Sequence, residues 1–170
     1  MAAALAYIGL GSNLAHPRRQ LARAVRALRR LPATSLLKLS RNYATAPQGT
    51  GDAQPDYVNA VAAVRTALAP RALLRRLLAI ERRQHRRRGP DAARNAPRTL
   101  DLDLLLYERR RIRSGDLTLP HPRLHLRAFA LRPLFDVAPA ITIPGRGLAR
   151  REWRAVRGQR ITPTRTHCLR

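Results

Sequence analysis

The sequence predicts a mixed α/β fold with an antiparallel sheet, the ferredoxin-like arrangement built from two split βαβ units. Apolar residues alternate at period two in four segments, and they recur at helical spacing in two others. These segments come in the order strand, helix, strand, strand, helix, strand, which is the order of that fold. Because 170 residues is an ordinary size for one domain, we predict a single domain over residues 1–170, with helices covering one face of the sheet.

The first split unit begins near the N-terminus. Residues 5–10 alternate and predict a strand, and residues 11–13, Gly-Ser-Asn, supply a turn. An amphipathic helix is predicted from about residue 17 to residue 31, where Pro32 ends it. Residues 36–43 then predict the second strand.

The second split unit follows a long irregular loop at about 45–55. Residues 57–65 have clear period-two character and predict the third strand. Residues 69–84 predict a helix with a proline in its first turn, and residues 99–107 predict the fourth strand. Between them lies a basic loop at about 82–98, which we expect to be mobile, as we do the loop at 45–55.

The C-terminal extension is rich in proline and arginine and is expected to pack on the core. Short helical stretches are predicted at 125–134 and 148–156. We expect no membrane span, because no apolar run approaches the roughly 20 residues that a transmembrane helix needs. The basic helix near the N-terminus resembles a transit peptide, but the strand before it and the ordinary serine content favour a core helix.

The net charge of +24 is strong enough to attract polyanions. Lys38 is the sole lysine, so the charge is nearly all arginine and is consistent with a coding bias. An arginine-rich α/β domain that binds nucleic acid remains an alternative function. For an enzyme, we expect nucleic-acid binding to be non-specific if it occurs at all. The lone Cys168 excludes an intrachain disulfide, which fits a reducing cytoplasm.

Two acidic residues, Asp101 and Asp103, interrupt the apolar run of the fourth strand. Residues two apart on a strand share a face, so both carboxylates are expected on one side, with Leu100, Leu102, Leu104 and Leu106 on the other. Mg²⁺ uses such a pair together with substrate phosphates. The alternative is that arginines simply neutralise both acids.

The arginine-rich loop before this strand strengthens the metal interpretation. One guanidinium group can bind two phosphate oxygens at once, and Arg98 lies three residues before Asp101. Cations and a metal platform would then meet at one place, as phosphoryl transfer requires. The chain has no P-loop motif, and Gly9 and Gly11 form only half of a dinucleotide fingerprint, so a turn explains them better.

Five motifs together resemble one family. They are YIGLGSNL (7–14), YATAPQG (43–49), QPDYVNAV (54–61), PRTLDLDLLLY (97–107) and LTLPHPRLHLRAFALRPLFDVAP (117–139). The sequence is similar in these to the 6-hydroxymethyl-7,8-dihydropterin pyrophosphokinases of folate biosynthesis. The resemblance implies transfer of pyrophosphate from ATP to the pterin hydroxymethyl group, leaving AMP, with two Mg²⁺ ions.

The resemblance also implies roles for individual residues. Asp101 and Asp103 would bind the metal ions, and Arg86 and Arg98 would neutralise charge during transfer. The remaining residues implied at the ATP site are Glu81, Leu104, Thr118, His121 and Arg127.

For the pterin, the resemblance implies a sandwich between the rings of Tyr57 and Phe129, for which ordinary core packing is the alternative. Tyr57 and Asn59 share a strand face, so an aromatic ring and an amide are expected side by side. The resemblance also places Thr45, Ala46 and Gln48 at the pterin edge.

The sequence departs from the family pattern in the basic loop. Asn95 and Ala96 stand where an aromatic residue and a glycine are frequent, and His85 stands in place of a glycine. Asp116 lies near the expected nucleotide site, where a basic or neutral residue is more usual. Another Mg²⁺-dependent nucleotidyl or phosphoryl transferase remains an alternative, and we expect a monomer.

Overall fold

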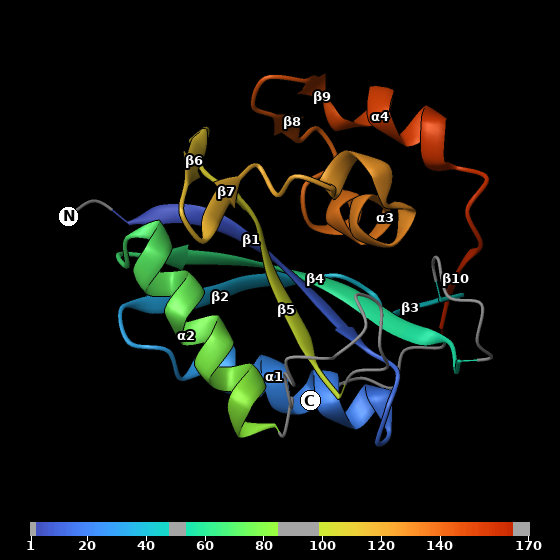
Figure 1. Cartoon of the computed structure of the whole chain (residues 1–170), viewed down its shortest axis with the longest axis horizontal. Coiled ribbons are helices and arrows are strands. Elements are labelled where there is room, and N and C mark those ends of the chain that lie inside the picture. Colours follow the sequence, from blue (N-terminus) through green and yellow to red (C-terminus); the bar gives the residue numbers. More distant parts are fainter. Residues whose placement is uncertain (1–2, 48–53, 85–98, 165–170) are drawn as a thin grey trace.

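The central sheet joins antiparallel strands from both ends of the sequence (Figure 1). The computed structural model describes residues 3–47, 54–84 and 99–164. Within these residues the sheet has six strands, which are Ala4–Ser12 (β1), Thr34–Leu39 (β2), Tyr43–Thr45 (β3), Tyr57–Thr66 (β4), Asp101–Tyr107 (β5) and Ile161–Pro163 (β10).

The strand order is that of a split βαβ fold. The order is β10-β3-β4-β1-β5, and β2 also pairs with β4. Strand β4 thus lies beside both β1 and β2, while β1 lies between β4 and β5, and all of these pairs are antiparallel. The predicted fold class is confirmed.

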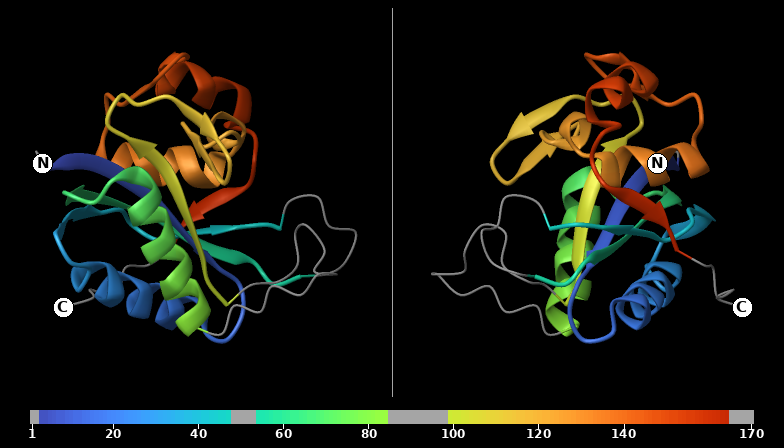
Figure 2. Two further views of the ribbon diagram at one scale, coloured as in Figure 1. Left: turned by 60° about the vertical axis from the view of Figure 1, so that its left-hand side comes forward. Right: turned by 90° about the vertical axis from the view of Figure 1, so that its right-hand side faces the viewer.

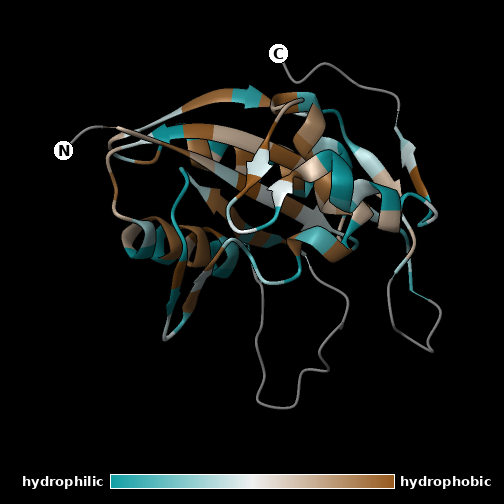
Figure 3. Cartoon of the chain, turned by 90° about the horizontal axis from the view of Figure 1, so that it is seen from above, coloured by the Kyte–Doolittle hydropathy of each residue, from teal (hydrophilic) through white to brown (hydrophobic). Residues whose placement is uncertain are grey.

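Two helices cover one face of this sheet. Helix α1 spans Pro17–Arg29 and helix α2 spans Pro70–Arg83. Both are amphipathic, because their buried apolar residues recur at helical spacing among exposed arginines. Figure 3 shows hydrophilic and hydrophobic residues mixed along the helices and strands in view. Each begins with a proline at its first position, where the missing N–H has no helical partner in any case. Their buried apolar residues, which pack with the sheet into one core, include Leu21, Val25, Leu28, Leu73, Leu77 and Ile80.

The opposite face of the sheet is also covered, which corrects the expectation of helices on one face only. Helix α3 spans Ala128–Val137 and packs on β4, and helix α4 spans Ala149–Val156 and packs on α3. Figure 2 shows these C-terminal helices on the side of the sheet away from α1 and α2. The sequence predicted both stretches and their packing on the core. It did not show that they close a second apolar core.

The extension also contains two short hairpins. Strands Ile112–Ser114 (β6) and Leu117–Leu119 (β7) pair with each other, as do Thr142–Ile143 (β8) and Gly147–Leu148 (β9). A single 3-10 turn, Leu124–Leu126, leads into α3.

The predicted strand at 36–43 is two strands, because Ser40 interrupts it. The Val61 backbone N–H donates to Ser40 Oγ, and the Ser40 N–H donates to the Val61 carbonyl, both at 2.9 Å. A serine side chain that bonds the neighbouring backbone competes with the strand ladder. The regular pairing with β4 therefore stops at Leu39 and resumes at Tyr43.

The expectation for Leu106 was wrong. Opposite Tyr7 and Ile8, β5 carries a bulge: Tyr7 pairs with Leu106 and Ile8 with Leu104, so Leu105 has no partner residue on β1. An extra residue shifts the alternation of the strand. Leu105 and Leu106 therefore both pack towards α3, whereas Leu104 faces α1 and α2.

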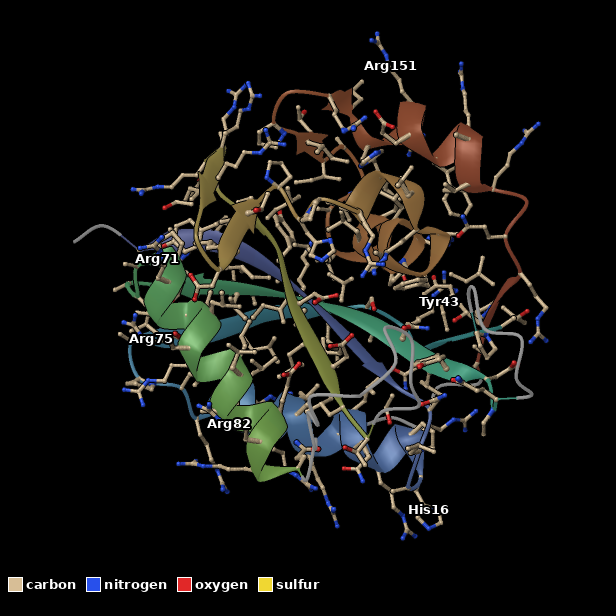
Figure 4. All side chains as sticks on the ribbon, in the orientation of Figure 1. His16, Tyr43, Arg71, Arg75, Arg82 and Arg151 are labelled. Atoms are coloured by element: carbon tan, nitrogen blue, oxygen red, sulfur yellow. The ribbon has the colours of Figure 1, made fainter. Side chains whose placement is uncertain are left out.

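Arginine side chains project from the surface of several elements. Arg71, Arg75 and Arg82 point outward from α2, and Arg151 from α4 (Figure 4). In the part of the chain that the structure describes, none of the helices has the length and apolar character needed to cross a bilayer.

A partly buried carboxylate ties α3 to β3. Asp136 Oδ2 accepts a hydrogen bond of 2.8 Å from the hydroxyl of Tyr43, and its Oδ1 accepts one of 3.0 Å from Arg132. The backbone N–H of Arg41 also donates to Oδ2, at 3.2 Å. Burial alone raises the pKa of Asp136, but the hydrogen bonds from Arg41 and Tyr43 outweigh it, and the pKa lies below its ordinary value.

We expect Asp136→Asn to lower the free energy of unfolding by about 1–3 kcal/mol at neutral pH, because the hydroxyl of the buried Tyr43 and the two arginines lose a charged acceptor. A lowered folded-state pKa stabilises the protein above the ordinary carboxyl pKa, and this contribution disappears as pH falls through the folded-state value. Urea unfolding at a series of pH values should therefore show the two proteins converging below about pH 4.

Asp116→Asn is the matched control for this substitution. Asp116 is exposed and lies 3.9 Å from Arg71, so its removal should change stability by less than about 1 kcal/mol. A difference between wild type and Asp136→Asn that stays constant down to pH 2 would contradict the role given to the Asp136 carboxylate.

Candidate active site

A cavity of about 350 Å³ opens between the sheet and the N-terminal end of α3. Strands β1, β3, β4 and β5 form its floor and sides, and the segment that leads into α3 closes it. The predicted site residues that line it are Thr45, Ala46, Tyr57, Asn59, Asp101, Asp103, Arg127 and Phe129. The structure therefore brings together the predicted metal and pterin residues, which are up to 84 positions apart in the sequence.

Gly9 and Gly11 make room for the two aspartates. In the antiparallel register of β1 and β5, Asp103 pairs with Gly9 and Asp101 with Gly11. A Cβ at Gly11 would lie 3.2 Å from Asn59 Oδ1, and one at Gly9 would lie 3.4 Å from the Leu105 side chain. The turn interpretation of these glycines was wrong. They are strand residues at which a side chain would fill the cavity.

Asp103 is the centre of a polar cluster. Its Oδ2 lies 3.4 Å from Arg127 Nη1 and 3.8 Å from His121 Nε2. Burial lowers the pKa of His121, the charges of Arg127 and Arg123 lower it further, and Asp103 opposes them without reversing the direction. The imidazole is therefore neutral at pH 7 and contacts Asp103 as a polar group rather than as a cation.

The backbone of β5 holds His121 close to Asp103. Leu105, the bulged residue, accepts a hydrogen bond of 2.8 Å from the His121 backbone N–H through its carbonyl. Bulges are frequent next to active sites, where they change the direction of a side chain. Leu105 also lines the cavity, on the strand face that carries Asp101 and Asp103.

Thr118 and His121 line a second, more polar cavity of about 790 Å³. It lies between the β6–β7 hairpin and the β8–β9 hairpin, and Arg111, Arg113 and Arg146 contribute to its walls. His121 therefore lines the second cavity and also contacts Asp103, which lines the first. A nucleotide whose phosphates reach Asp103 would have polar, cationic surroundings on this side.

The pterin residues form the apolar half of the first cavity. Asn59 and Thr45 are 5% exposed, and Asn59 Nδ2 donates a hydrogen bond of 2.8 Å to Thr45 Oγ1. This bond fixes the orientation of the amide. The Arg127 guanidinium carbon lies 5.2 Å from the centre of the Phe129 ring, so the two halves of the cavity are in contact.

Glu81 and Leu104 do not line the cavity. Glu81 is 2% exposed and accepts a hydrogen bond of 2.7 Å from the backbone N–H of Leu102, the residue between the two aspartates. The Leu104 side chain packs in the core beneath α1 and α2. In this structure Glu81 fixes the backbone of β5 rather than lining the cavity.

Three predicted site residues, Gln48, Arg86 and Arg98, lie outside the described residues, as do His85, Asn95 and Ala96. The described residues add Arg123 and Leu126 to the first cavity. No local pattern predicted these two, because their contribution depends on how the segment before α3 folds over the sheet. Asp116 lies on the surface, opposite Arg71.

The carboxylate pair fits Mg²⁺ better than a metal held by protein ligands alone. Among the described residues, no group of three or more His, Cys, Asp or Glu side chains could hold a metal ion. Asp101 and Asp103 supply two hard oxygen ligands at an open cavity, which suits a cation that keeps waters and shares substrate phosphates. The alternative, in which arginine neutralises the acids, has support at Asp103, because Arg127 contacts its carboxylate.

The chain is similar to known proteins over most of its length. Residues 7–139 match the family model described as 7,8-dihydro-6-hydroxymethylpterin-pyrophosphokinase, or HPPK. A 2-amino-4-hydroxy-6-hydroxymethyldihydropteridine pyrophosphokinase of Pseudomonas aeruginosa is 48% identical over 138 residues, covering 81% of this chain and 83% of that protein. An enzyme of the same name from Haemophilus influenzae is 46% identical over 139 residues, covering 82% of this chain and 84% of that protein.

Solved structures share the fold at low sequence identity. A crystal structure described as HPPK-DHPS in complex with substrates superposes with a TM-score of 0.70 at 12% identity, covering 91% of this chain. This chain spans only 43% of that longer chain. Taken with the family match and the relatives above, these findings show that the chain belongs to the 7,8-dihydro-6-hydroxymethylpterin-pyrophosphokinase family.

Proposed function

We propose that this chain transfers the pyrophosphoryl group of ATP to the hydroxyl of 6-hydroxymethyl-7,8-dihydropterin, giving the pterin diphosphate and AMP. The observation that carries the proposal is that one cavity holds both the carboxylate pair and the aromatic residues. A metal-bound polyphosphate and a flat heterocyclic alcohol would therefore meet there. Family membership supports the same reaction.

The polar half of the cavity would hold the ATP phosphates. Asp101 and Asp103 would bind two Mg²⁺ ions, which supply charge neutralisation at the phosphates when bound. Arg127 reaches Asp103 from the α3 side and is placed to contact a phosphate oxygen. Thr118 and the neutral His121 would contact the nucleotide from the second cavity, and Arg86 and Arg98 remain predicted phosphate contacts.

The apolar half would hold the pterin. The ring would stack between Tyr57 and Phe129, and Asn59 would present its amide to the polar edge of the heterocycle. Thr45 and Ala46 border the same space, with Gln48 a further predicted contact. In this arrangement the pterin hydroxyl oxygen faces the carboxylate pair, so that it attacks the β-phosphorus while the bond to the α-phosphate oxygen breaks.

The cavity that holds the carboxylate pair favours a small-molecule substrate over a nucleic acid. Arg71, Arg75 and Arg82 all extend from α2, and Arg151 extends from α4 (Figure 4), whereas the carboxylates and aromatic residues line one cavity. The monomeric state and the cytoplasmic location stay predictions.

The test is an assay of AMP release from MgATP by the purified chain, with and without 6-hydroxymethyl-7,8-dihydropterin. We expect AMP and pterin diphosphate to form in equal amounts and only when the pterin is present. AMP release at the same rate without pterin would refute this function and favour another nucleotide-cleaving transferase.

A further inference from the structure

The strongest unassigned feature is the C-terminal segment that lies against the cavity. The family match ends at residue 139, yet Gln159 and Arg160 pack behind the cavity wall that carries Phe129. A small cavity of about 190 Å³ is lined by this segment together with Thr45, Pro47 and Phe129. The segment is therefore in a position to influence the site.

Gln159 binds the peptide groups on both sides of Arg127. Its Oε1 accepts a hydrogen bond of 2.9 Å from the Ala128 N–H, and its Nε2 donates one of 2.9 Å to the Leu126 carbonyl. One amide side chain thus holds the backbone immediately before and immediately after Arg127. The residue between these two bonds is the one that contacts Asp103.

Helix α3 needs such a partner because its own N-cap is poor. The N-cap residue is Arg127, in an extended conformation, and it makes no side-chain capping hydrogen bond. The first N–H groups of a helix lack partners within the helix, and arginine is not among the residues that cap them well. Gln159 supplies the missing acceptor to Ala128 from 31 residues away.

The segment that carries Gln159 is itself fixed to the substrate-binding strands. Arg160 forms an ion pair with Asp56, which precedes Tyr57. Strand β10 pairs with β3, with Ile161 opposite Thr45, and the Thr164 N–H donates to the Asn42 carbonyl at 2.9 Å. The segment 159–164 therefore connects α3 to β3 and β4 and holds them in position relative to one another.

We propose that Gln159 is a positioning residue for the reaction: it fixes Arg127 and Phe129, so that the phosphate contact and the pterin platform keep their places relative to Asp103 and Tyr57. The proposal rests on the proposed function for its kinetic consequences. It also predicts a local structural effect that does not depend on activity.

The kinetic test uses Gln159→Met, which keeps the length of the side chain and removes both hydrogen bonds. We expect the KM for the pterin to rise and kcat to fall, with kcat/KM lower by roughly 10-fold to 100-fold, because small displacements of binding groups have effects of this size. Thr34→Val is the matched control. It removes the 2.7 Å hydrogen bond between Thr34 and Thr66, away from the cavity, and should leave both constants unchanged.

A double-mutant cycle with Arg127→Ala separates positioning from general destabilisation. If Gln159 acts through Arg127, part of the loss in kcat/KM should disappear when Gln159→Met is made in the Arg127→Ala protein. Full additivity of the two losses would overturn the proposal. So would kinetic constants of Gln159→Met within twofold of wild type.

Amide hydrogen exchange at Ala128, followed by NMR, provides the readout without activity. We expect exchange of this amide to be at least about 10-fold faster in Gln159→Met than in wild type, with β4 amides unchanged. Equal exchange at Ala128 would overturn the proposal. If wild type were inactive but Ala128 still exchanged faster in Gln159→Met, the result would contradict the proposed reaction and leave the positioning role in place.

Discussion

Replacing Asp101 or Asp103 with asparagine should lower kcat for pyrophosphoryl transfer by at least ~100-fold, the size of effect seen when one charge-stabilising group is removed from an active site. Both residues lie on one face of β5, opposite Gly11 and Gly9, and both line the cavity. Asparagine keeps the shape of the side chain but loses the charge that holds Mg²⁺.

The fold should survive these substitutions. Two carboxylates two residues apart on a strand repel each other, so loss of one charge removes a repulsion as well as the contact of Asp103 with Arg127. Circular dichroism and urea unfolding should show a free energy of unfolding within about 1 kcal/mol of the wild-type value.

The decisive measurement is kcat as a function of Mg²⁺ concentration. For the aspartate variants, we expect the Mg²⁺ concentration needed for half-maximal activity to rise together with the loss of kcat. Glu152→Gln is a charge-matched control on α4, where Glu152 lies 3.7 Å from Arg146, and it should behave as wild type. Near-normal kcat in either aspartate variant would exclude the metal role of that residue.

Phe129→Ala should raise the KM for the pterin by about 30-fold and change the KM for MgATP much less. The ring would contribute burial and stacking together worth about 2 kcal/mol, and 1.4 kcal/mol corresponds to a factor of 10. A modest effect on ATP is expected as well, because Arg127 packs against the same ring.

Phe135→Ala is the matched control on the same helix. Phe135 packs edge-on against Trp153, with ring centroids 6.0 Å apart, and it does not line the cavity. This variant should lose stability without a change in the KM for the pterin. If the two phenylalanine variants changed both KM values equally, Phe129 would be a packing residue, the alternative that its sequence context favours.

Local patterns predicted most of the core elements and half of the site. The helical spacing of Leu73, Leu77 and Ile80 predicted α2, and the period of β5 placed Asp101 and Asp103 on one face. Such patterns are informative because they depend on neighbours a few residues apart. The bulge at Leu105 broke the pattern at Leu106, since a bulge depends on the partner strand rather than on the local sequence.

By itself, the sequence determined the order of strands and helices, the carboxylate pair and, through its motifs, the family. Only the tertiary structure decided that Gly9 and Gly11 clear the space opposite the aspartates, that α3 covers the second face, and that Gln159 holds the backbone around Arg127. The physical reason is the separation along the sequence of the residues that interact. Periodicity and turn chemistry act between residues close in sequence, whereas cross-strand register, helix packing and the capping of one segment by another join residues that meet only when the chain has folded.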